Sequence, residues 1–90
     1  MPGNNKISRN RIYIDRIDEK VLALLNRRAE LSLKIRKVKQ DCGNALYDPK
    51  REEEVVDNLC KKNKGPLYDE NVREIFKQIM KINRELPDEK

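Results

Sequence analysis

The sequence predicts an all-α protein with three helices, one long and two shorter, and three observations support this class. Apolar residues recur at alternating steps of three and four positions, which is the spacing of one face of a helix. Charged residues make up 41% of the 90 residues and aromatic residues 4%, a balance typical of solvated helices rather than sheets. Gly and Pro separate the apolar runs, where they interrupt helices.

The longest apolar run predicts a helix from about Ser8 to Gln40. Its apolar face carries Ile14, Ile17, Val21, Leu24, Leu31, Ile35 and Val38. Residues 1–7 contain Pro, Gly and two Asn, so we expect a disordered leader before the helix. Gly43 follows the run and can take the left-handed conformation that closes a helix.

A helix of this length is longer than the domain that it belongs to. About 33 residues at about 1.5 Å each span about 50 Å, whereas a domain of about 100 residues has a radius of gyration of about 13 Å. The apolar face at the overhanging end needs a second chain to cover it. The sequence therefore predicts an intertwined helical homodimer.

A second, shorter helix is expected after the first break. Asp48 can accept backbone N–H bonds as its N-cap, and Pro49 suits the first helical position because its missing N–H has no partner there. This helix runs to about Lys62, where Asn63-Lys64-Gly65-Pro66 breaks the chain.

A third helix is expected from about Glu70 to Leu86, with Asp69 as its N-cap. Together the three helices would form one domain over residues 8–86. Residues 87–90 would then be a short tail after that domain.

Each predicted helix carries one polar residue on its apolar face, namely Arg28, Glu52 and Asn83. Any one of them alone is more simply a partly exposed or paired polar residue of a core. One in each of three helices favours a polar pocket inside the bundle. Because a guanidinium is costly in an apolar interior unless an anion meets it, Arg28 indicates that the pocket receives negative charge.

Helical geometry adds four residues to this pocket. At about 100° per residue, Lys39 points to nearly the same side of the first helix as Arg28, about 16 Å further along. Arg11 lies about 100° off that side, so it suits the pocket of a partner chain better than its own. Asp48 lies one turn before the polar residue of the second helix, with Arg51 beside it. For Arg51, a solvated surface charge is an equally open interpretation.

Composition excludes several other classes of function. The net charge of +5 favours anionic partners, but the charges are mixed and no basic block with aromatics or zinc-finger spacing occurs, so nucleic acid is not expected. Cys42 and Cys60 lack CxxC spacing and the chain has no His, so we expect no metal and a reducing compartment. Neither a signal-peptide core nor a run of about 18 apolar residues occurs, which predicts a cytoplasmic protein without a membrane partner.

The polar residues stand within longer motifs. These are Arg11-x-x-Ile14-Asp15-x-Ile17-Asp18, the segment LLNRRAEL with Arg28, then Lys39, and the turn Asp48-Pro49-x-Arg51-Glu52. In this combination the chain resembles the all-helical class of chorismate mutases, most nearly the mutase domain at the N-terminus of bifunctional chorismate mutase/prephenate dehydratase proteins. The resemblance spans about residues 8–86 and includes Gly65-Pro66-Leu67 and Ile75-Phe76-x-x-Ile79-Met80.

The resemblance implies a reaction and an assembly. The reaction is the rearrangement of chorismate to prephenate, at the head of phenylalanine and tyrosine biosynthesis, in a homodimer with two identical pockets. It is a single pericyclic step in which the C–O bond breaks ahead of C–C bond formation, so negative charge builds on the ether oxygen. Positioning and fixed charge can therefore supply the catalysis, without a nucleophile, metal or cofactor.

The resemblance also implies roles for the cations of the pocket. Arg28 and Arg11 of the partner chain would clamp the two substrate carboxylates, because a guanidinium binds a carboxylate through two parallel bonds. Lys39 would donate to the ether oxygen. Lys39, Arg28 and Glu52 are thus the catalytic candidates.

The remaining roles belong to the second and third helices. Glu52, with Asp48, would hold the ring hydroxyl of the substrate. Arg51 would orient that end of the pocket and balance the charge of Glu52. Asn83 stands where the family usually has Ser, near a substrate carboxylate.

Two positions depart from the family pattern and bear on the level of activity. Pro87 stands where members usually carry Gln or Glu, whose side chain makes a second hydrogen bond to the ether oxygen. Proline has no such group and tends to end a helix. Arg36 stands where the family prefers a small residue, most often Gly. It is harmless if it faces outward and would crowd Lys39 if it faces inward.

Two alternative functions fit the same pattern. Isochorismate-pyruvate lyases share the fold and much of the cationic pocket, and product analysis with both substrates separates the two reactions. A catalytically silent helical dimer that acts in regulation or assembly is the alternative from another class. Comparing the rate of the chain alone with its rate beside candidate partners tests that alternative. A fused or associated dehydratase or synthase domain is a further partner that the resemblance allows.

Overall fold

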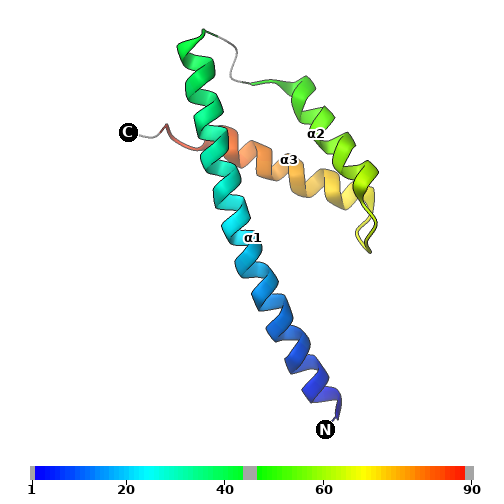
Figure 1. Cartoon of the computed structure of the whole chain (residues 1–90). Coiled ribbons are helices and arrows are strands. Elements are labelled where there is room, and N and C mark those ends of the chain that lie inside the picture. The colour runs from blue at the N-terminus through cyan, green and yellow to red at the C-terminus, as the bar shows by residue number, and fades with distance from the viewer. Residues whose placement is uncertain (1, 44–46, 89–90) are drawn as a thin grey trace. The chain divides into compact units, whose positions relative to one another are not determined.

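The structure, a computed structural model, describes residues 2–43 and 47–88, and its secondary structure within these ranges is entirely helical. Three helices follow one another along the chain: α1 (Pro2–Asp41), α2 (Pro49–Lys62) and α3 (Asp69–Glu85) (Figure 1). The predicted all-helical class, with one long and two shorter helices, is confirmed. The chain divides into two compact units, residues 1–30 and 31–90, and α1 contributes to both of them.

The long helix α1 begins at Pro2 rather than at about Ser8. Residues 3–7, for which we expected a disordered leader, are helical. Pro2 is compatible with this start because the first N–H groups of a helix have no intrahelical acceptor, so a missing donor costs little there. At the other end Gly43 has a φ of 72°, which confirms the expected left-handed residue after the helix.

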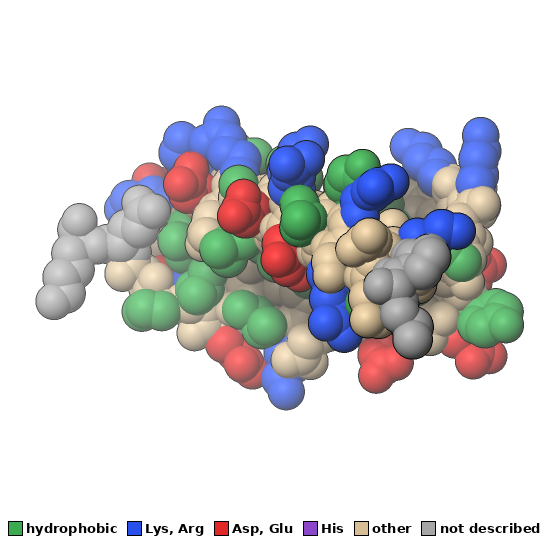
Figure 2. Space-filling view, turned by 90° about the horizontal axis from the view of Figure 1, so that it is seen from below, with side chains coloured by type: hydrophobic (Ala, Val, Ile, Leu, Met, Phe, Trp, Pro, Cys, Tyr) green, Lys and Arg blue, Asp and Glu red, His purple; other side chains and the backbone are tan. Residues whose placement is uncertain are grey.

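In the first unit, the apolar face predicted for α1 is exposed. The exposed large hydrophobic residues of this unit are Ile7, Ile12, Tyr13, Ile14, Ile17, Val21, Leu22, Leu24 and Leu25. The space-filling view shows hydrophobic side chains at the surface among Lys, Arg, Asp and Glu (Figure 2). A single helix has no second surface of its own on which to bury such a face, so this unit lacks a core.

In the second unit, α2 packs against α3. The buried hydrophobic residues are Val56 from α2 and Val72 and Met80 from α3. This core is small, and ion pairs of three cations on α3 join the same helices. Arg73 contacts Glu53 and Asp57, Lys77 lies 4.0 Å from Glu53, and Arg84 contacts Glu52.

The two shorter helices differ in how closely their observed starts match the predicted ones. Asp48 caps α2 as predicted, because its Oδ1 accepts from the Arg51 backbone N–H at 3.0 Å and Pro49 follows in the first turn. The N-cap of α3 is Tyr68, one position earlier than expected, and its backbone N–H donates to Asn71 Oδ1 at 3.0 Å. Asp69 is the first residue of α3 rather than its cap, and its Oδ1 accepts from Asn63 in the preceding loop.

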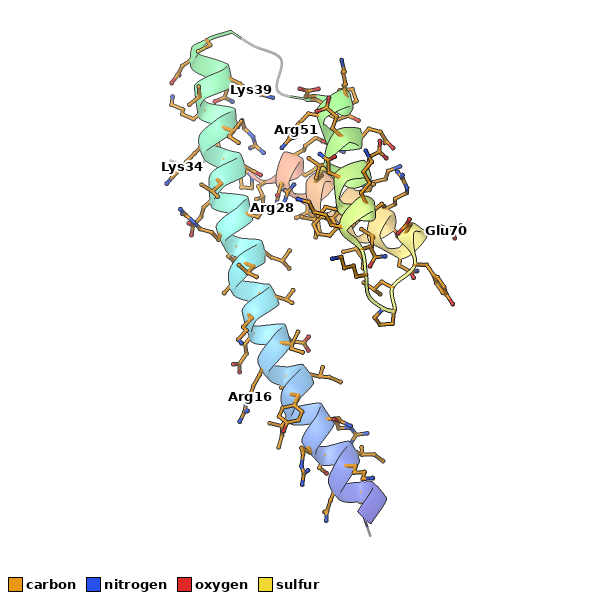
Figure 3. The ribbon with its side chains drawn as sticks, turned by 45° about the vertical axis from the view of Figure 1, so that its right-hand side comes forward. Arg16, Arg28, Lys34, Lys39, Arg51 and Glu70 are labelled. Carbon is orange, nitrogen blue, oxygen red and sulfur yellow. The ribbon has the colours of Figure 1, made fainter. Side chains whose placement is uncertain are left out.

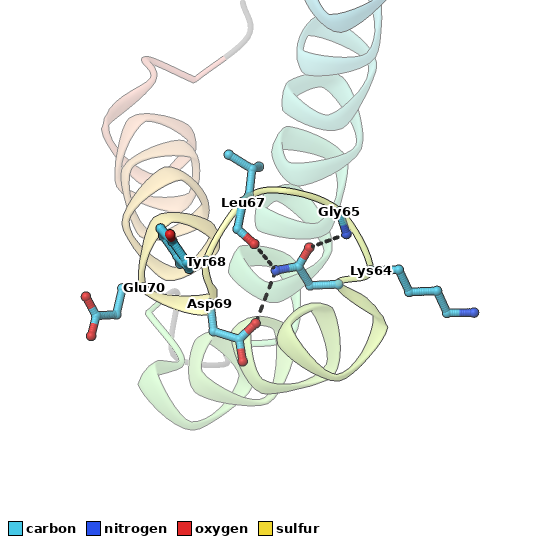
Figure 4. A pocket seen from close by; sticks show the side chains of 7 residues that line it. Lys64, Gly65, Leu67, Tyr68, Asp69 and Glu70 are labelled. Atoms are coloured by element: carbon cyan, nitrogen blue, oxygen red, sulfur yellow. Dashed lines mark hydrogen bonds between the residues drawn. The ribbon is translucent and has the colours of Figure 1, made fainter.

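That loop is organised by Asn63, the residue after α2. Figure 4 shows its partners Gly65, Leu67 and Asp69 with the hydrogen bonds between the residues drawn. The Asn63 Nδ2 donates to Leu67 O at 2.7 Å and to Asp69 Oδ1 at 3.2 Å, while its Oδ1 accepts from the Gly65 N–H at 3.3 Å. One side chain thus closes the turn between the helices.

None of the helices, over the described residues, has a stretch long and apolar enough to cross a membrane.

Candidate active site

The site residues expected from the sequence are divided between the two units. Residues 1–30 contain Arg11 and Arg28, and residues 31–90 contain Lys39, Asp48, Arg51, Glu52 and Asn83. Arg11 is exposed on α1, whereas Arg28 is half-buried. The second unit therefore carries most of the candidate site.

Lys39 is half-buried in the last turn of α1. It projects from the opposite side of the helix to Lys34, which is exposed (Figure 3). The difference in exposure follows from the helical period, since five residues turn the helix by about 140° beyond a full circle. Lys39 therefore lies on the better shielded side of this helix end.

Asn83 is buried in α3, the only polar residue among the buried ones that the structure describes. The Ser32 hydroxyl, on the part of α1 that belongs to the second unit, donates to Asn83 Oδ1 at 3.2 Å. A buried amide needs such a partner, because an unsatisfied polar group in an interior costs about 1–3 kcal/mol. The polar position expected on the apolar face of α3 is thus buried and hydrogen-bonded.

Glu52 is the most shielded carboxylate of the inter-helix ion pairs described above, with 23% of its side chain exposed. Both of its oxygens accept from Arg84 Nη1 at 2.5 Å. The guanidinium carbon of Arg84 lies 4.5 Å from the centroid of the Tyr47 ring, within the range of a cation–π contact. The bond to Glu52 raises the pKa of Arg84 above its ordinary value.

Arg84 was absent from the residues expected from the sequence, which assigned the balance of Glu52 to Arg51. In the structure Arg51 is 64% exposed and lies 3.9 Å from Glu54 Oε2. Adjacent residues diverge by about 100° on a helix, so Arg51 reaches a residue one turn away rather than its neighbour Glu52. A usable signal for Arg84 was present, because it lies four residues after Met80 and so shares the side of α3 that faces the core.

Arg36 faces inward and binds the end of α3. Its Nη2 donates to Asn83 O at 2.6 Å and to Arg84 O at 3.0 Å, and its Nη1 donates to Leu86 O at 2.6 Å. Only 14% of the Arg36 side chain is exposed. Its guanidinium also holds Asp88 at 3.1 Å and, together with Gln40, lowers the pKa of that carboxyl.

The inward position of Arg36 is explained by Pro87. In an α-helix the carbonyl of Asn83 would accept from the N–H four residues later, which Pro87 lacks. The helix ends at Glu85, and Arg36 supplies the missing donor to Asn83 O. The two departures from the family pattern are therefore one structural feature, a cation on α1 that closes the end of α3.

Two depressions surround these groups in the second unit. One, of about 270 Å³, is lined by Arg36, Gln40, Tyr47, Arg84 and Asp88. The other, of about 530 Å³, extends over α2 and α3 and includes Tyr47, Glu52 and Arg84 in its lining. Of the predicted site residues, Glu52 lines one of these two depressions, while Asp48 caps α2.

Among the described residues, no cluster of three or more His, Cys, Asp or Glu is arranged to hold a metal ion.

The chain is therefore a small all-helical domain with a highly charged candidate site. Guanidinium, ammonium and carboxylate groups of its helices lie around small depressions. Within that class, the chain belongs to the chorismate mutase type II family, whose model matches residues 10–87. The resemblance drawn from the sequence motifs is thereby confirmed.

Curated relatives include proteins of two lengths. The bifunctional chorismate mutase/prephenate dehydratase of Pseudomonas aeruginosa is 35% identical over 85 residues, which cover 89% of this chain and 23% of that protein. The chain thus spans less than a quarter of the bifunctional relatives that it matches. The chorismate mutase of Methanocaldococcus jannaschii is 33% identical over 82 residues, which cover 90% of this chain and 83% of that protein.

Solved structures of chorismate mutases share the fold. Form II of the enzyme from Thermus thermophilus superimposes with a TM-score of 0.89 at 37% identity, covering 93% of this chain and 99% of that chain. The Helicobacter pylori chorismate mutase, solved in complex with prephenate, gives a TM-score of 0.79 at 32% identity and covers 87% of this chain and 84% of that chain.

Proposed function

We propose that this chain catalyses the rearrangement of chorismate to prephenate in phenylalanine and tyrosine biosynthesis. The observation that carries the proposal is the family match over residues 10–87, which includes every candidate site residue. Two similar proteins support it: the M. jannaschii relative is itself a chorismate mutase, and the H. pylori enzyme holds prephenate in its crystal structure.

The proposed mechanism uses fixed charge and position. Arg28 and Arg11 of a second chain bind the two carboxylates of the substrate. These contacts hold the two fragments of the substrate in the chair conformation that the reaction needs. Lys39 donates to the ether oxygen as negative charge develops there. Groups already oriented toward that charge stabilise the transition state more than the ground state, and this difference is what accelerates the reaction.

The remaining candidates act on the ring of the substrate and beside its carboxylates. Glu52 accepts from the ring hydroxyl, with Asp48 at the same end, and Asn83 lies near a carboxylate. Arg51 is proposed to orient the surface end of this region. The half-buried Glu52 supports its role, because a carboxylate shielded from water forms stronger hydrogen bonds than an exposed one.

The proposal includes an intertwined homodimer with Arg11 supplied in trans. The exposed apolar face of α1 between Ile7 and Leu25 supports it, since monomeric proteins rarely leave a contiguous apolar surface of this kind uncovered. A second copy of the same helix would offer a matching face. A dehydratase domain is fused to the mutase domain in the bifunctional relatives, and such a domain is a candidate partner here.

The direct test is a continuous assay of chorismate disappearance with the purified chain, followed by identification of the product. Prephenate as the product supports the proposal, and no turnover at any accessible enzyme concentration rejects it. Because α3 ends before Pro87 and lacks the side-chain donor expected there, isochorismate is the second substrate to assay. Release of pyruvate from isochorismate, without conversion of chorismate, would favour the lyase.

A further inference from the structure

The contacts of Arg84 exceed those of an ordinary surface ion pair. The guanidinium holds both oxygens of Glu52 and lies against the ring of Tyr47. The backbone carbonyl of Arg84 accepts from Arg36 at 3.0 Å, so both ends of the residue are held. Its side chain is 34% exposed, and the shielding strengthens the ion pair relative to one in open water.

These contacts restrict the carboxylate of Glu52. A glutamate on a helix surface samples several rotamers, whereas one whose two oxygens share a stationary guanidinium has one preferred orientation. Each carboxylate oxygen has two lone pairs, so a second donor can still bind on the side away from Arg84. Arg84 thereby aligns an acceptor without occupying all of it.

We infer that Arg84 is a positioning residue that orients Glu52 toward the ring hydroxyl of the substrate and so sets the preference for substrates that carry this hydroxyl. The inference rests on the proposed function, because it needs chorismate in the site and Glu52 as the acceptor of that hydroxyl. It assigns to Arg84 a role in specificity that Arg51, exposed and beside Glu54, does not have.

The chain contains a matched control for this residue. Arg73 also lies on α3 and also bridges to α2, with Nη1 3.0 Å from Glu53 and Nη2 2.8 Å from Asp57. Its side chain is 38% exposed, close to the value for Arg84. Neither acceptor of Arg73 is a candidate site residue. Its removal therefore costs a comparable inter-helix bridge and leaves the orientation of Glu52 unchanged.

The experiment measures kcat and KM of the full chain with chorismate and with the analogue of chorismate that lacks the ring hydroxyl. The variants are Arg84→Ala, Arg84→Lys, Glu52→Ala, the double variant of Glu52→Ala with Arg84→Ala, and Arg73→Ala. For Arg84→Ala we expect kcat/KM for chorismate to fall about 10- to 100-fold, the usual effect of a hydrogen bond to a charged group. The change should appear mainly in KM, because the ground state and the transition state both carry this bond.

Four further results are expected if Arg84 acts through Glu52. The analogue without the hydroxyl should be converted by Arg84→Ala within about twofold of the wild-type rate, since it makes no bond to Glu52 that could be lost. The double variant should be no slower than Glu52→Ala alone. Arg84→Lys should prefer chorismate over the analogue more strongly than Arg84→Ala does. Arg73→Ala should show the full preference of the wild-type chain for chorismate.

Other outcomes would overturn the inference. An equal loss for both substrates, or the same loss in Arg73→Ala, would make Arg84 a structural bridge only. Additive losses in the double variant would show that Arg84 acts independently of Glu52. A faster Arg84→Ala enzyme would show that the ion pair withholds Glu52 from the substrate. If Arg84→Ala fails to fold, as judged by circular dichroism, Arg84→Lys and Arg84→Gln carry the same comparison.

The design separates this inference from the proposed function. A wild-type chain that converts neither substrate overturns the proposed function and this inference with it. A wild-type chain that converts chorismate, with a full hydroxyl preference retained in Arg84→Ala, overturns the inference alone.

Discussion

Helix α1 and the pair of helices α2 and α3 use the same helical pattern to different effect. In residues 3–27 of α1 every side chain is exposed, including the apolar face. In α2 and α3 the apolar faces meet, and Val56, Val72 and Met80 are buried. An apolar stripe thus indicates which face of a helix needs cover, and only a packed neighbour provides it. Substitutions on the two regions can test whether a second chain covers the face of α1.

The largest effect is expected from a charge on that face. Leu24→Asp should convert the proposed dimer to monomers, because burying a carboxylate against an apolar partner is strongly unfavourable. Activity should fall more than about 10³-fold, beyond the loss of a single donor, since Arg11 of the partner leaves the site as well. Sedimentation velocity and the chorismate assay measure both changes.

Asn26→Asp is the matched control for Leu24→Asp. It adds the same carboxylate to the same helix, about 160° away around the axis, where the residue is also exposed. This variant should remain dimeric and active. If the wild-type protein sediments as a monomer, or if the Leu24→Asp variant stays dimeric, this face of α1 is not the dimer interface.

The second effect concerns the half-buried cation at the end of α1. Lys39→Ala should lower kcat about 10²- to 10³-fold, the usual loss when a donor to a developing oxyanion is removed. Lys34→Ala, on the opposite and exposed side of the helix, should be close to wild type. Turnover measurements on the two folded variants provide the comparison. Equal rates for both would exclude Lys39 from the mechanism.

The third effect compares truncations in the two regions. Val56→Ala, at a fully buried position, should lower the free energy of unfolding by about 2 kcal/mol through lost contacts and a residual cavity. Val21→Ala removes the same atoms from the exposed face of α1. Urea unfolding at several protein concentrations separates two cases for Val21→Ala: a loss that depends on concentration indicates a dimer interface, and no loss at any concentration would argue against one.

The smallest effect concerns Arg36 and Pro87. Arg36→Ala should lower the free energy of unfolding by about 1–2 kcal/mol, because charged hydrogen bonds to the end of α3 are lost. In a Pro87→Ala background the same change should cost less, since the restored backbone N–H can bond to Asn83 O. Lys37→Ala, which breaks an exposed pair with Asp41, is the control and should cost about 0.5 kcal/mol or less. Equal costs of Arg36→Ala in both backgrounds would show that Arg36 and Pro87 act independently.

Local signals predicted the helices well. The cap at Asp48, the left-handed Gly43 and the break at Asn63 all lie where the sequence indicated, because each depends on hydrogen bonds within a few residues. Helix α1 begins earlier than the Pro and Gly near the N-terminus predict, because a proline suits the first turn of a helix. The cap of α3 lies one residue earlier than predicted, at Tyr68, while Asp69 accepts a hydrogen bond from the more distant Asn63.

The contacts of the candidate site were predicted less completely. The sequence identified Glu52 and Asn83 as polar residues on apolar faces, but it assigned Arg51 as the counter-charge of Glu52 and missed Arg84. It also left the direction of Arg36 open between outward and inward. Both answers depend on pairs of residues that are far apart in the chain, such as Arg84 and Glu52.

The amino-acid order alone was sufficient for the helical class and the ends of most helices, because these follow from the 3.6-residue period and from bonds within one turn. The pairing of Arg84 with Glu52 and the closure of α3 by Arg36 follow from packing between helices. Each helix carries several Lys or Arg residues, and the sequence does not distinguish which of them pairs with a given carboxylate or carbonyl. Their positions in the folded chain determine the pairing.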